Sequence, residues 1–196
     1  MILGITGGTG CGKTTLLSSI EGRGGLVLDC DAVYHRLLKE DKGMLSSIAA
    51  RFPEAMEGET LVLKKLGKLV FADGQALLDL NAITHRAVKA EVLRQLETKK
   101  PSLAAIDAIA LFEGGLAELC DKTVAVTAPI EDRVKRLMLR DRISEDYARS
   151  RIAAQHDEGW FRKRVDFVLT NDGTPQEFHR KCGDFLDTLG ILIENK

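Results

Sequence analysis

The sequence predicts an α/β fold built around a largely parallel β-sheet. Two observations lead to this expectation. Short apolar runs alternate along the chain with segments of helical period, and a glycine-rich turn joins the first run directly to an apolar-striped helix. A parallel sheet is favoured because parallel strands need crossover connections, and these are usually helical.

Five segments are expected to form the strands of this sheet. Each is a short apolar run followed by glycine, charge or proline, and the runs span residues 2–6, 26–29, 103–107, 123–127 and 166–169. Helices are expected between them. Two have clear apolar stripes, one of Ile130, Val134, Leu137 and Met138, the other of Phe178, Cys182, Phe185 and Leu189.

Residues 31–100 interrupt the alternation, and no clear strand is expected among them. Three helical stripes are present instead: Leu45, Ile48 and Phe52; Leu63, Leu66 and Val70; and Leu80, Ile83, Ala87 and Ala90. A structureless loop of this length is uncommon, so we expect a helical insertion over one edge of the sheet. A second insertion, residues 141–165, is dense in charge and poor in large apolar residues, which would allow it to move.

The composition limits the classes of partner. The chain has 196 residues, of which 44% are hydrophobic and 29% charged, and its formal net charge is −1. It therefore has no general positive field for nucleic acid, and any anion must be bound by a local cluster. The four cysteines form no C-x-x-C pair, and neither a signal peptide nor a membrane span is evident, so we expect a cytoplasmic protein.

The glycine-rich turn fits the phosphate-binding pattern G-x-x-x-x-G-K-[ST] from Gly7 to Thr14. Glycines let successive backbone N–H groups approach phosphate oxygens, and the helix N-terminus adds a favourable dipole. Lys13 is expected to reach the β- and γ-phosphates, and Thr14 to bind Mg²⁺. The residues assigned here to binding the nucleoside triphosphate are Gly8, Thr9, Gly10, Cys11, Gly12, Lys13, Thr14 and Thr15.

Three classes of phosphate-loop protein compete for this sequence. A GTPase should show N-K-x-D, which is missing, and the D-x-x-G at Asp187 lies in the C-terminal helix. A motor ATPase usually carries Asp-Glu after an apolar run, but Ala108 follows Asp107. A small-molecule kinase needs a carboxylate near the acceptor hydroxyl, arginines that close over the phosphates and an acceptor pocket. The chain offers candidates for all three.

Asp29 and Asp31 follow the second expected strand, where an open α/β sheet presents residues to its ligand. One of them could accept the proton of an attacking hydroxyl, but capping of the next helix explains an aspartate there equally well. Arg133, Arg136 and Arg140 recur at i, i+3 and i+7 on one helix face. Such arginines can neutralise charge during phosphoryl transfer, or they can simply form a solvated face with nearby acids.

Taken in order, the motifs resemble those of the dephospho-coenzyme A kinase family. Thr6–Thr14 is similar to its T-G-G-x-G-x-G-K-[ST] loop, residues 29–31 to its D-A-D, residues 80–85 to L-N-x-x-x-H-P, and residues 111–113 to the end of P-L-L-F-E. Residues 140–155 resemble its R-D-x-x-[ST]-x-x-x-A-x-x-R-I-x-x-Q lid, and residues 166–173 its D-[FY]-V-I-x-N-x-G segment. Two positions depart from the pattern, since Arg86 and Ile109 replace family prolines.

The resemblance implies phosphorylation of the ribose 3′-hydroxyl of dephospho-coenzyme A by ATP and Mg²⁺. It also implies a phosphate-loop nucleoside triphosphate hydrolase core of residues 1–30, 101–139 and 166–196, a helical acceptor domain of residues 31–100, and a lid of residues 140–165. The catalytic residues would be Asp31, Lys13 and Arg140, with Arg136 as the alternative arginine. Acceptor-binding residues would be Asp29, His85, Phe112 and Glu113, and Asn171 and Gly173 would flank adenine. We expect a monomer or a weak homo-oligomer.

Overall fold

The computed structural model describes residues 1–192, which form two compact units. The first contains residues 1–28, 101–111 and the described residues from Leu116 onward. The second contains Asp29–Lys100 together with Phe112–Gly115. Each unit has its own interior and is described separately.

A five-stranded sheet forms the centre of the first unit, with strand order β2-β5-β1-β6-β7. The strands are β1 (Ile2–Thr6), β2 (Leu26–Asp29), β5 (Ala104–Asp107), β6 (Lys122–Thr127) and β7 (Phe167–Thr170). Strand β1 runs parallel to both of its neighbours, and β6 runs parallel to β7. All five predicted strands are present, each within one residue of its predicted bounds.

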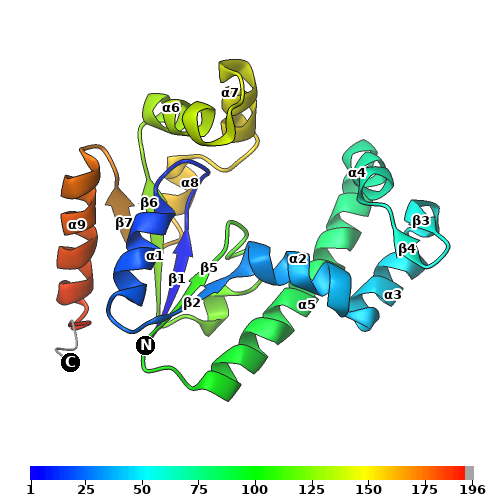
Figure 1. Cartoon of the computed structure of the whole chain (residues 1–196), viewed down its shortest axis with the longest axis horizontal. Coiled ribbons are helices and arrows are strands. Elements are labelled where there is room, and N and C mark those ends of the chain that lie inside the picture. Colours follow the sequence, from blue (N-terminus) through cyan, green and yellow to red (C-terminus); the bar gives the residue numbers. More distant parts are fainter. Residues whose placement is uncertain (193–196) are drawn as a thin grey trace. The chain divides into compact units, whose positions relative to one another are not determined.

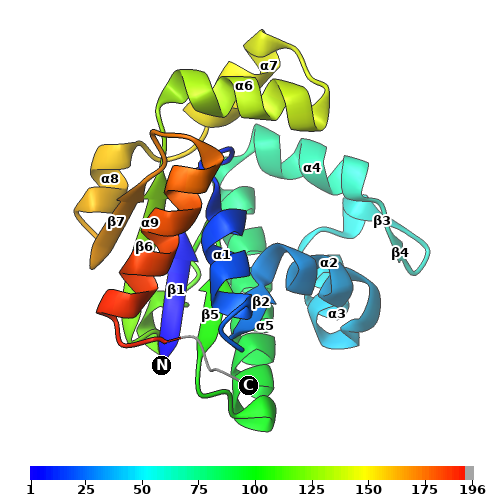
Figure 2. The ribbon, with the colours of Figure 1, turned by 60° about the vertical axis from the view of Figure 1, so that its left-hand side comes forward.

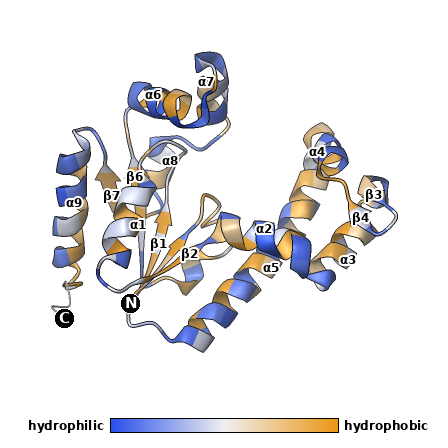
Figure 3. Cartoon of the chain, in the orientation of Figure 1, coloured by the Kyte–Doolittle hydropathy of each residue, from blue (hydrophilic) through white to orange (hydrophobic). Residues whose placement is uncertain are grey.

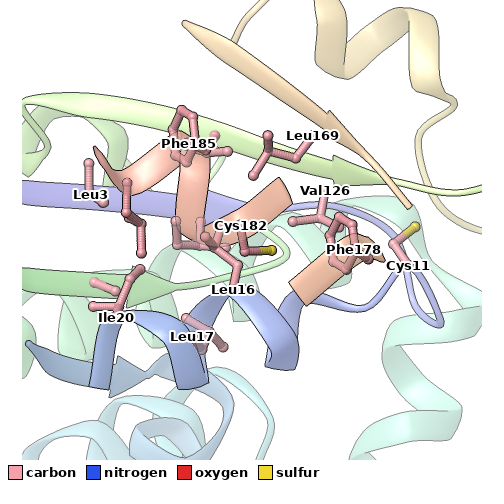
Figure 4. Packing of buried hydrophobic residues seen from close by; sticks show 14 of the residues in the cluster. Leu3, Cys11, Leu16, Leu17, Ile20, Val126, Leu169, Phe178, Cys182 and Phe185 are labelled. Carbon is pink, nitrogen blue, oxygen red and sulfur yellow. The ribbon is translucent and has the colours of Figure 1, made fainter. Parts of the chain in front are cut away.

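Helices α1 (Lys13–Glu21) and α9 (Pro175–Thr188) lie side by side on one face of this sheet (Figures 1 and 2). Their apolar sides meet the strands in a single core. Figure 4 shows this core extending from Leu3 and Ile20 to Phe178 and Cys11, beside the turn that follows β1. The strands are strongly hydrophobic in Figure 3, whereas much of α9 is hydrophilic, as expected for a helix with one solvated side.

Helices α6 (Ile130–Asp141) and α7 (Glu145–Ala153) pack together beyond the C-terminal ends of the strands (Figures 1 and 2). Their small core contains Val134 and Leu137 from α6. The other two members of the predicted stripe, Ile130 and Met138, are 56% and 37% exposed, because α7 is short and covers only part of α6. The short helices α8 (Glu158–Arg162) and η2 (Ala117–Leu119) complete the unit.

The second unit is helical. The long helix α5 (Gly74–Lys99) is contacted by α2 (Cys30–Glu40), α3 (Lys42–Arg51) and α4 (Leu63–Ala72), and a 3-10 turn η1 (Pro53–Ala55) packs against α4 (Figure 1). The predicted helical insertion is thus present. Within residues 1–192, no helix is both long and apolar enough to cross a bilayer.

Two expectations for this unit were wrong. The insertion contains a small hairpin, β3 (Met56–Glu57) and β4 (Thr60–Leu61), turning at Gly58 with φ 61°. Strands of two residues are too short to leave a periodic signal. The buried face of α5 also differs from the predicted stripe. It consists of Ala76, Leu80, Thr84, Val88 and Val92, so only Leu80 was predicted. Three helices contact α5 and together decide which of its sides is buried. The Thr84 hydroxyl donates to the Leu80 carbonyl at 3.0 Å, so this polar residue can lie on the buried face.

Candidate active site

The phosphate loop, residues 7–14, connects β1 to α1. Gly7, Gly10 and Gly12 have φ of 131°, 78° and 98°, in the region that L side chains rarely adopt. At Gly7 a side chain is also excluded by the neighbouring strand, since an added Cβ would lie 2.2 Å from the Val126 carbonyl oxygen. The loop is therefore fixed by its own backbone and by β6, and it leads directly into the N-terminus of α1.

Three cations gather on this loop and are hydrogen-bonded to its carbonyl oxygens. The Lys13 ammonium donates to Gly7 at 3.0 Å, Arg133 Nε to Thr9 at 2.9 Å, and Arg136 Nη1 to Gly10 at 3.2 Å. Arg133 is buried, with 9% exposure. Among residues 1–192 none of the three has a carboxylate partner, although the whole chain has a net charge of −1. The arrangement is a local site of uncompensated positive charge, which suits a polyanionic ligand.

Two side-chain amides complete the loop's surroundings. The buried Asn171 donates to the Cys11 carbonyl at 2.9 Å and accepts from Arg136 at 3.3 Å. Gln155, just after α7, accepts from the Thr9 backbone N–H at 2.8 Å and from Arg133 at 3.2 Å. The loop is thus held by the residue after β7 on one side and by the residue shortly after α7 on the other.

The remaining arginines of α6 and α7 are paired with acids. Arg140 makes a bidentate contact with the neighbouring Asp141 at 2.7 and 3.1 Å, and Arg151 reaches the same carboxylate at 2.6 Å. The hydrogen bonds from Arg140, followed by those from Arg151, lower the pKa of Asp141 to about 2. Arg149 bonds to Glu131 and Glu145. The single face predicted for Arg133, Arg136 and Arg140 therefore divides, because only the first two contact the loop.

Cys11 lies inside the loop, and its side chain is 3% exposed. Burial raises the pKa of its thiol, although the nearby charges of Arg133 and Lys13 act in the opposite direction. The thiol is accordingly neutral and serves as a small apolar group in the core below the loop.

The predicted acceptor residues all belong to the second unit. Strand β2 ends at Asp29, whose carboxylate caps α2 by accepting from the Ala32 N–H at 3.0 Å. The capping interpretation is therefore right for Asp29, and the two aspartates do not share an extended segment. Asp31 is exposed in the first turn of α2, and its carboxylate has no hydrogen-bond or ion-pair partner within the described chain.

Helix α2 is tied to α5 by an ion pair. Arg36 contacts Glu91 at 2.7 Å, and hydrogen bonds from Arg94 first, and also from Arg36, hold the pKa of Glu91 at about 2. His85 is half-buried on α5, in the same unit as Phe112 and Glu113. Two residues depart from the family pattern. Arg86 is exposed. The backbone carbonyl of Ile109 accepts a hydrogen bond from Thr6 Oγ1 at 3.2 Å, and a proline at this position would have the same carbonyl.

The donor set of the loop fits Mg²⁺ bound together with a nucleotide. Thr14 is exposed in the first turn of α1, so its hydroxyl is accessible. Residues 1–192 contain no cluster of three or more His, Cys, Asp or Glu side chains suited to a metal ion. Mg²⁺ keeps several waters and takes few protein ligands when it binds the substrate's phosphates, so the Thr14 hydroxyl could serve as one of those ligands.

An open groove of about 440 Å³ borders the turn between β7 and α9. Asp172, Gly173 and Phe178 are among the residues that line it. Lys181 and Thr170 line it too, and the Lys181 ammonium donates to the Thr170 carbonyl at 2.7 Å. The side chain of Asn171 is occupied by the loop and by Arg136, so its exposed neighbours Asp172 and Gly173 offer the accessible surface of this turn.

The sequence did not reveal what Gln155 and Arg133 do. The sequence marked Gln155 only as one residue of the family's lid pattern, and Arg133 only as one of several arginines. The spacing of Arg133 and Arg136 at i and i+3 placed both on one helix face, and the glycines of the loop allow that face to approach. At Gly8 an added Cβ would lie 2.3 Å from Arg133 Nη2.

Comparisons with known proteins agree with one another. The sequence model of the family described as dephospho-CoA kinase matches residues 1–177. A dephospho-CoA kinase of Bacillus licheniformis is 32% identical over 193 residues, covering 96% of each chain. One from Thermus thermophilus is 34% identical over 180 residues, covering 92% of this chain and 87% of its own.

The solved structures give the same result. A crystal structure of a Thermus thermophilus protein superposes with a TM-score of 0.81 at 33% identity, covering 96% of this chain and 97% of the other. Dephospho-CoA kinase from Campylobacter jejuni gives 0.66 at 25% identity, covering 96% of both chains. A shikimate kinase from Bacteroides thetaiotaomicron, 16% identical with a TM-score of 0.58 over 97% of this chain and 98% of its own, shares the fold. The predicted fold class, a parallel phosphate-loop core with helical additions, is confirmed.

Proposed function

This chain belongs to the dephospho-CoA kinase family, and from that premise we propose that it transfers the γ-phosphate of ATP to the ribose 3′-hydroxyl of dephospho-CoA. The product is CoA, so the reaction completes coenzyme A synthesis. The observation that supports this most strongly is the group of three cations on the phosphate loop, each bonded, within residues 1–192, only to neutral oxygens.

The reaction requires the protein chiefly to position the two substrates and to neutralise the charge of the phosphates. The 3′-oxygen of the acceptor attacks the γ-phosphorus, the bond to the β–γ bridging oxygen breaks, and ADP leaves with the negative charge. Lys13, Arg133 and Arg136 neutralise the phosphates in this step. The Thr14 hydroxyl would hold Mg²⁺ together with the phosphates, and the ion would supply further neutralisation when bound.

Asp31 is assigned to the acceptor hydroxyl, as the base that takes its proton or orients its attack. Its exposure and its lack of a partner in the described chain support this choice over Asp29, whose carboxylate is used in capping α2. The second unit, with His85, Phe112 and Glu113, is assigned to binding the acceptor. Their membership of one compact unit supports that assignment.

Arg140 is assigned to the transferring phosphoryl group, and to act there it must exchange Asp141 for phosphate oxygens. Residues 140–165 would then be a lid that closes over the nucleotide. Adenine is assigned to the turn at Asn171–Gly173, chiefly through Asp172 and Gly173, because the Asn171 side chain is already bonded.

The protein is proposed to act in the cytoplasm as a monomer or weak homo-oligomer. All four cysteines are free thiols, which suits a reducing compartment. Sedimentation of the purified chain over a concentration series would measure the oligomeric state.

An ADP-release assay against a panel of acceptors tests the activity. Dephospho-CoA should raise turnover far above the rate with water, and nucleosides or shikimate should not; equal rates for all acceptors would refute the assignment. Asp31→Asn should then lower kcat by roughly 100-fold or more while ATP binding survives. Asp29→Asn keeps an acceptor for the cap and should leave most of the activity.

A further inference from the structure

Thr9, Arg133 and Gln155 form a closed ring of hydrogen bonds on the phosphate loop, which we call the Thr9 clamp. The Thr9 N–H donates to Gln155 Oε1 at 2.8 Å, Arg133 Nη2 donates to the same oxygen at 3.2 Å, and Arg133 Nε donates to the Thr9 carbonyl at 2.9 Å. Both backbone polar groups of Thr9 are therefore held by side chains, the carbonyl by Arg133 of α6 and the N–H by Gln155, just after α7. One oxygen of Gln155 fixes the loop and the guanidinium together.

The residue that accepts both bonds is neutral, and this has an energetic consequence. A buried guanidinium is ordinarily compensated by a carboxylate, because burying an unpaired charge is costly. Arg133 is only 9% exposed, and within residues 1–192 its side chain bonds to neutral oxygens alone. Glutamate at position 155 would keep both hydrogen bonds in nearly the same shape and would strengthen them by placing a negative charge on their acceptor.

We infer that Gln155 is a positioning residue whose neutrality leaves the charge of Arg133 for the triphosphate. The carboxamide holds the guanidinium on the loop, and a carboxylate in its place would cancel the charge before the nucleotide arrives. Some stability is given up to preserve affinity, as is usual in binding sites. The inference rests on the proposed binding of ATP to this loop.

The decisive comparison is between Gln155→Glu and Gln155→Ala, with ATP affinity measured by calorimetry. Gln155→Glu should raise the Kd for ATP at least about 10-fold, equivalent to about 1.4 kcal/mol, while the urea midpoint stays the same or rises. Gln155→Ala loses both bonds but leaves the charge, and should raise Kd less. If the clamp is only structural, the order is reversed, because alanine removes contacts that glutamate keeps; that order would overturn the inference.

A double-mutant cycle tests whether the effect acts through Arg133. Arg133→Met should itself raise the Kd, and Gln155→Glu should have little further effect in that background. An undiminished effect there would mean that the carboxylate repels ATP directly, which also contradicts the inference. If Gln155→Glu does not fold, Arg133→Met is compared with Gln155→Ala: loss of the charge should raise the Kd more than loss of the two Gln155 bonds alone, and equal effects would overturn the inference.

Two controls complete the design. Gln176→Glu introduces the same change in the exposed first turn of α9 and should leave the Kd near the wild-type value. Trp160 is the only tryptophan, and its ring stacks on His156, next to Gln155, at 3.8 Å with an interplanar angle of 2°. Its unchanged emission would show that the segment keeps its structure in each variant.

Failure of the inference is distinguishable from failure of the proposed function. A wild-type protein that does not bind ATP would refute the function before any variant is compared. A wild-type protein that binds ATP and phosphorylates dephospho-CoA, combined with the reversed order of the Gln155 variants, would refute the inference alone.

Discussion

Gly8→Ala perturbs the contact between the phosphate loop and Arg133 with a single methyl group. The added Cβ would lie 2.3 Å from Arg133 Nη2, 2.9 Å from its Cζ and 3.1 Å from Gln155 Oε1. The backbone of Gly8 lies outside the left-handed region, so alanine adds no strain there. The cavity beside the loop is only about 20 Å³ and cannot take a guanidinium, so Arg133 must move outward.

The expected cost falls mainly on nucleotide binding. Outside the loop the guanidinium exchanges two bonds to neutral oxygens for bonds to water, a change of about 1 kcal/mol each at most in stability. A hydrogen bond from the guanidinium to a charged phosphate contributes about 1.5–3 kcal/mol. The Kd for ATP should therefore rise roughly 10- to 100-fold, while the free energy of unfolding falls by less than about 2 kcal/mol.

Calorimetry with ATP and urea unfolding monitored by Trp160 emission measure the two quantities. Gly67→Ala is the matched control, since its Cβ would meet only Phe71 at 3.9 Å inside α4. That variant should gain about 0.5–1 kcal/mol in stability from helix propensity and bind ATP normally. If Gly8→Ala keeps wild-type affinity, Arg133 does not act on the nucleotide from its observed position, and the reasoning fails.

Three further predictions concern stability, each measured by urea unfolding. Asn171→Ala should cost about 2–4 kcal/mol, because it removes two hydrogen bonds and leaves the carbonyl of Cys11 without its buried donor; a loss under about 1 kcal/mol would contradict this. Arg23→Met should cost about 2–3 kcal/mol, since the guanidinium, with 6% side-chain exposure, bonds an aspartate and a carbonyl of α9 and another carbonyl just beyond it. Hydrogen bonds, first of all from Arg94, lower the pKa of Glu91 to about 2. The stabilising effect of its carboxylate is therefore complete above about pH 4.5 and is lost as the pH falls toward 2. The stability of Glu91→Gln should differ most from that of the wild type near pH 5 and least near pH 3, and a constant difference would contradict the assignment.

Much of the first unit could be predicted because its signals are local. Each strand is an apolar run bounded by a breaker, and the phosphate loop is a contiguous motif between a strand and a helix. The start of α7 follows a local rule of the same kind, since serine favours N-cap positions and Ser144 caps this helix by accepting from the Tyr147 N–H at 3.3 Å. Patterns of this kind need no knowledge of what packs against the segment.

The remaining features depend on tertiary contacts, which single-segment patterns do not contain. The spacing of Arg133, Arg136 and Arg140 does not distinguish them. Their partners differ because the loop lies against the first two, whereas Asp141 lies beside Arg140. The buried face of α5 was misassigned for the same reason, since three other helices decide which side is covered. Asp29 and Asp31 were likewise separable only once the end of β2 was known.

The glycines of the phosphate loop meet two demands at once. Their usual explanation is the close approach of phosphate to the backbone. In this protein an added Cβ would also collide with the protein itself: at Gly8 with Arg133, and at Gly12 with the Asn171 amide nitrogen at 2.4 Å. Side chains that hold the loop thus occupy the space the glycines leave open. The loop should therefore keep its shape before ATP binds, and a substitution at Gly8 or Gly12 should disturb the ligand-free protein as well as its complex.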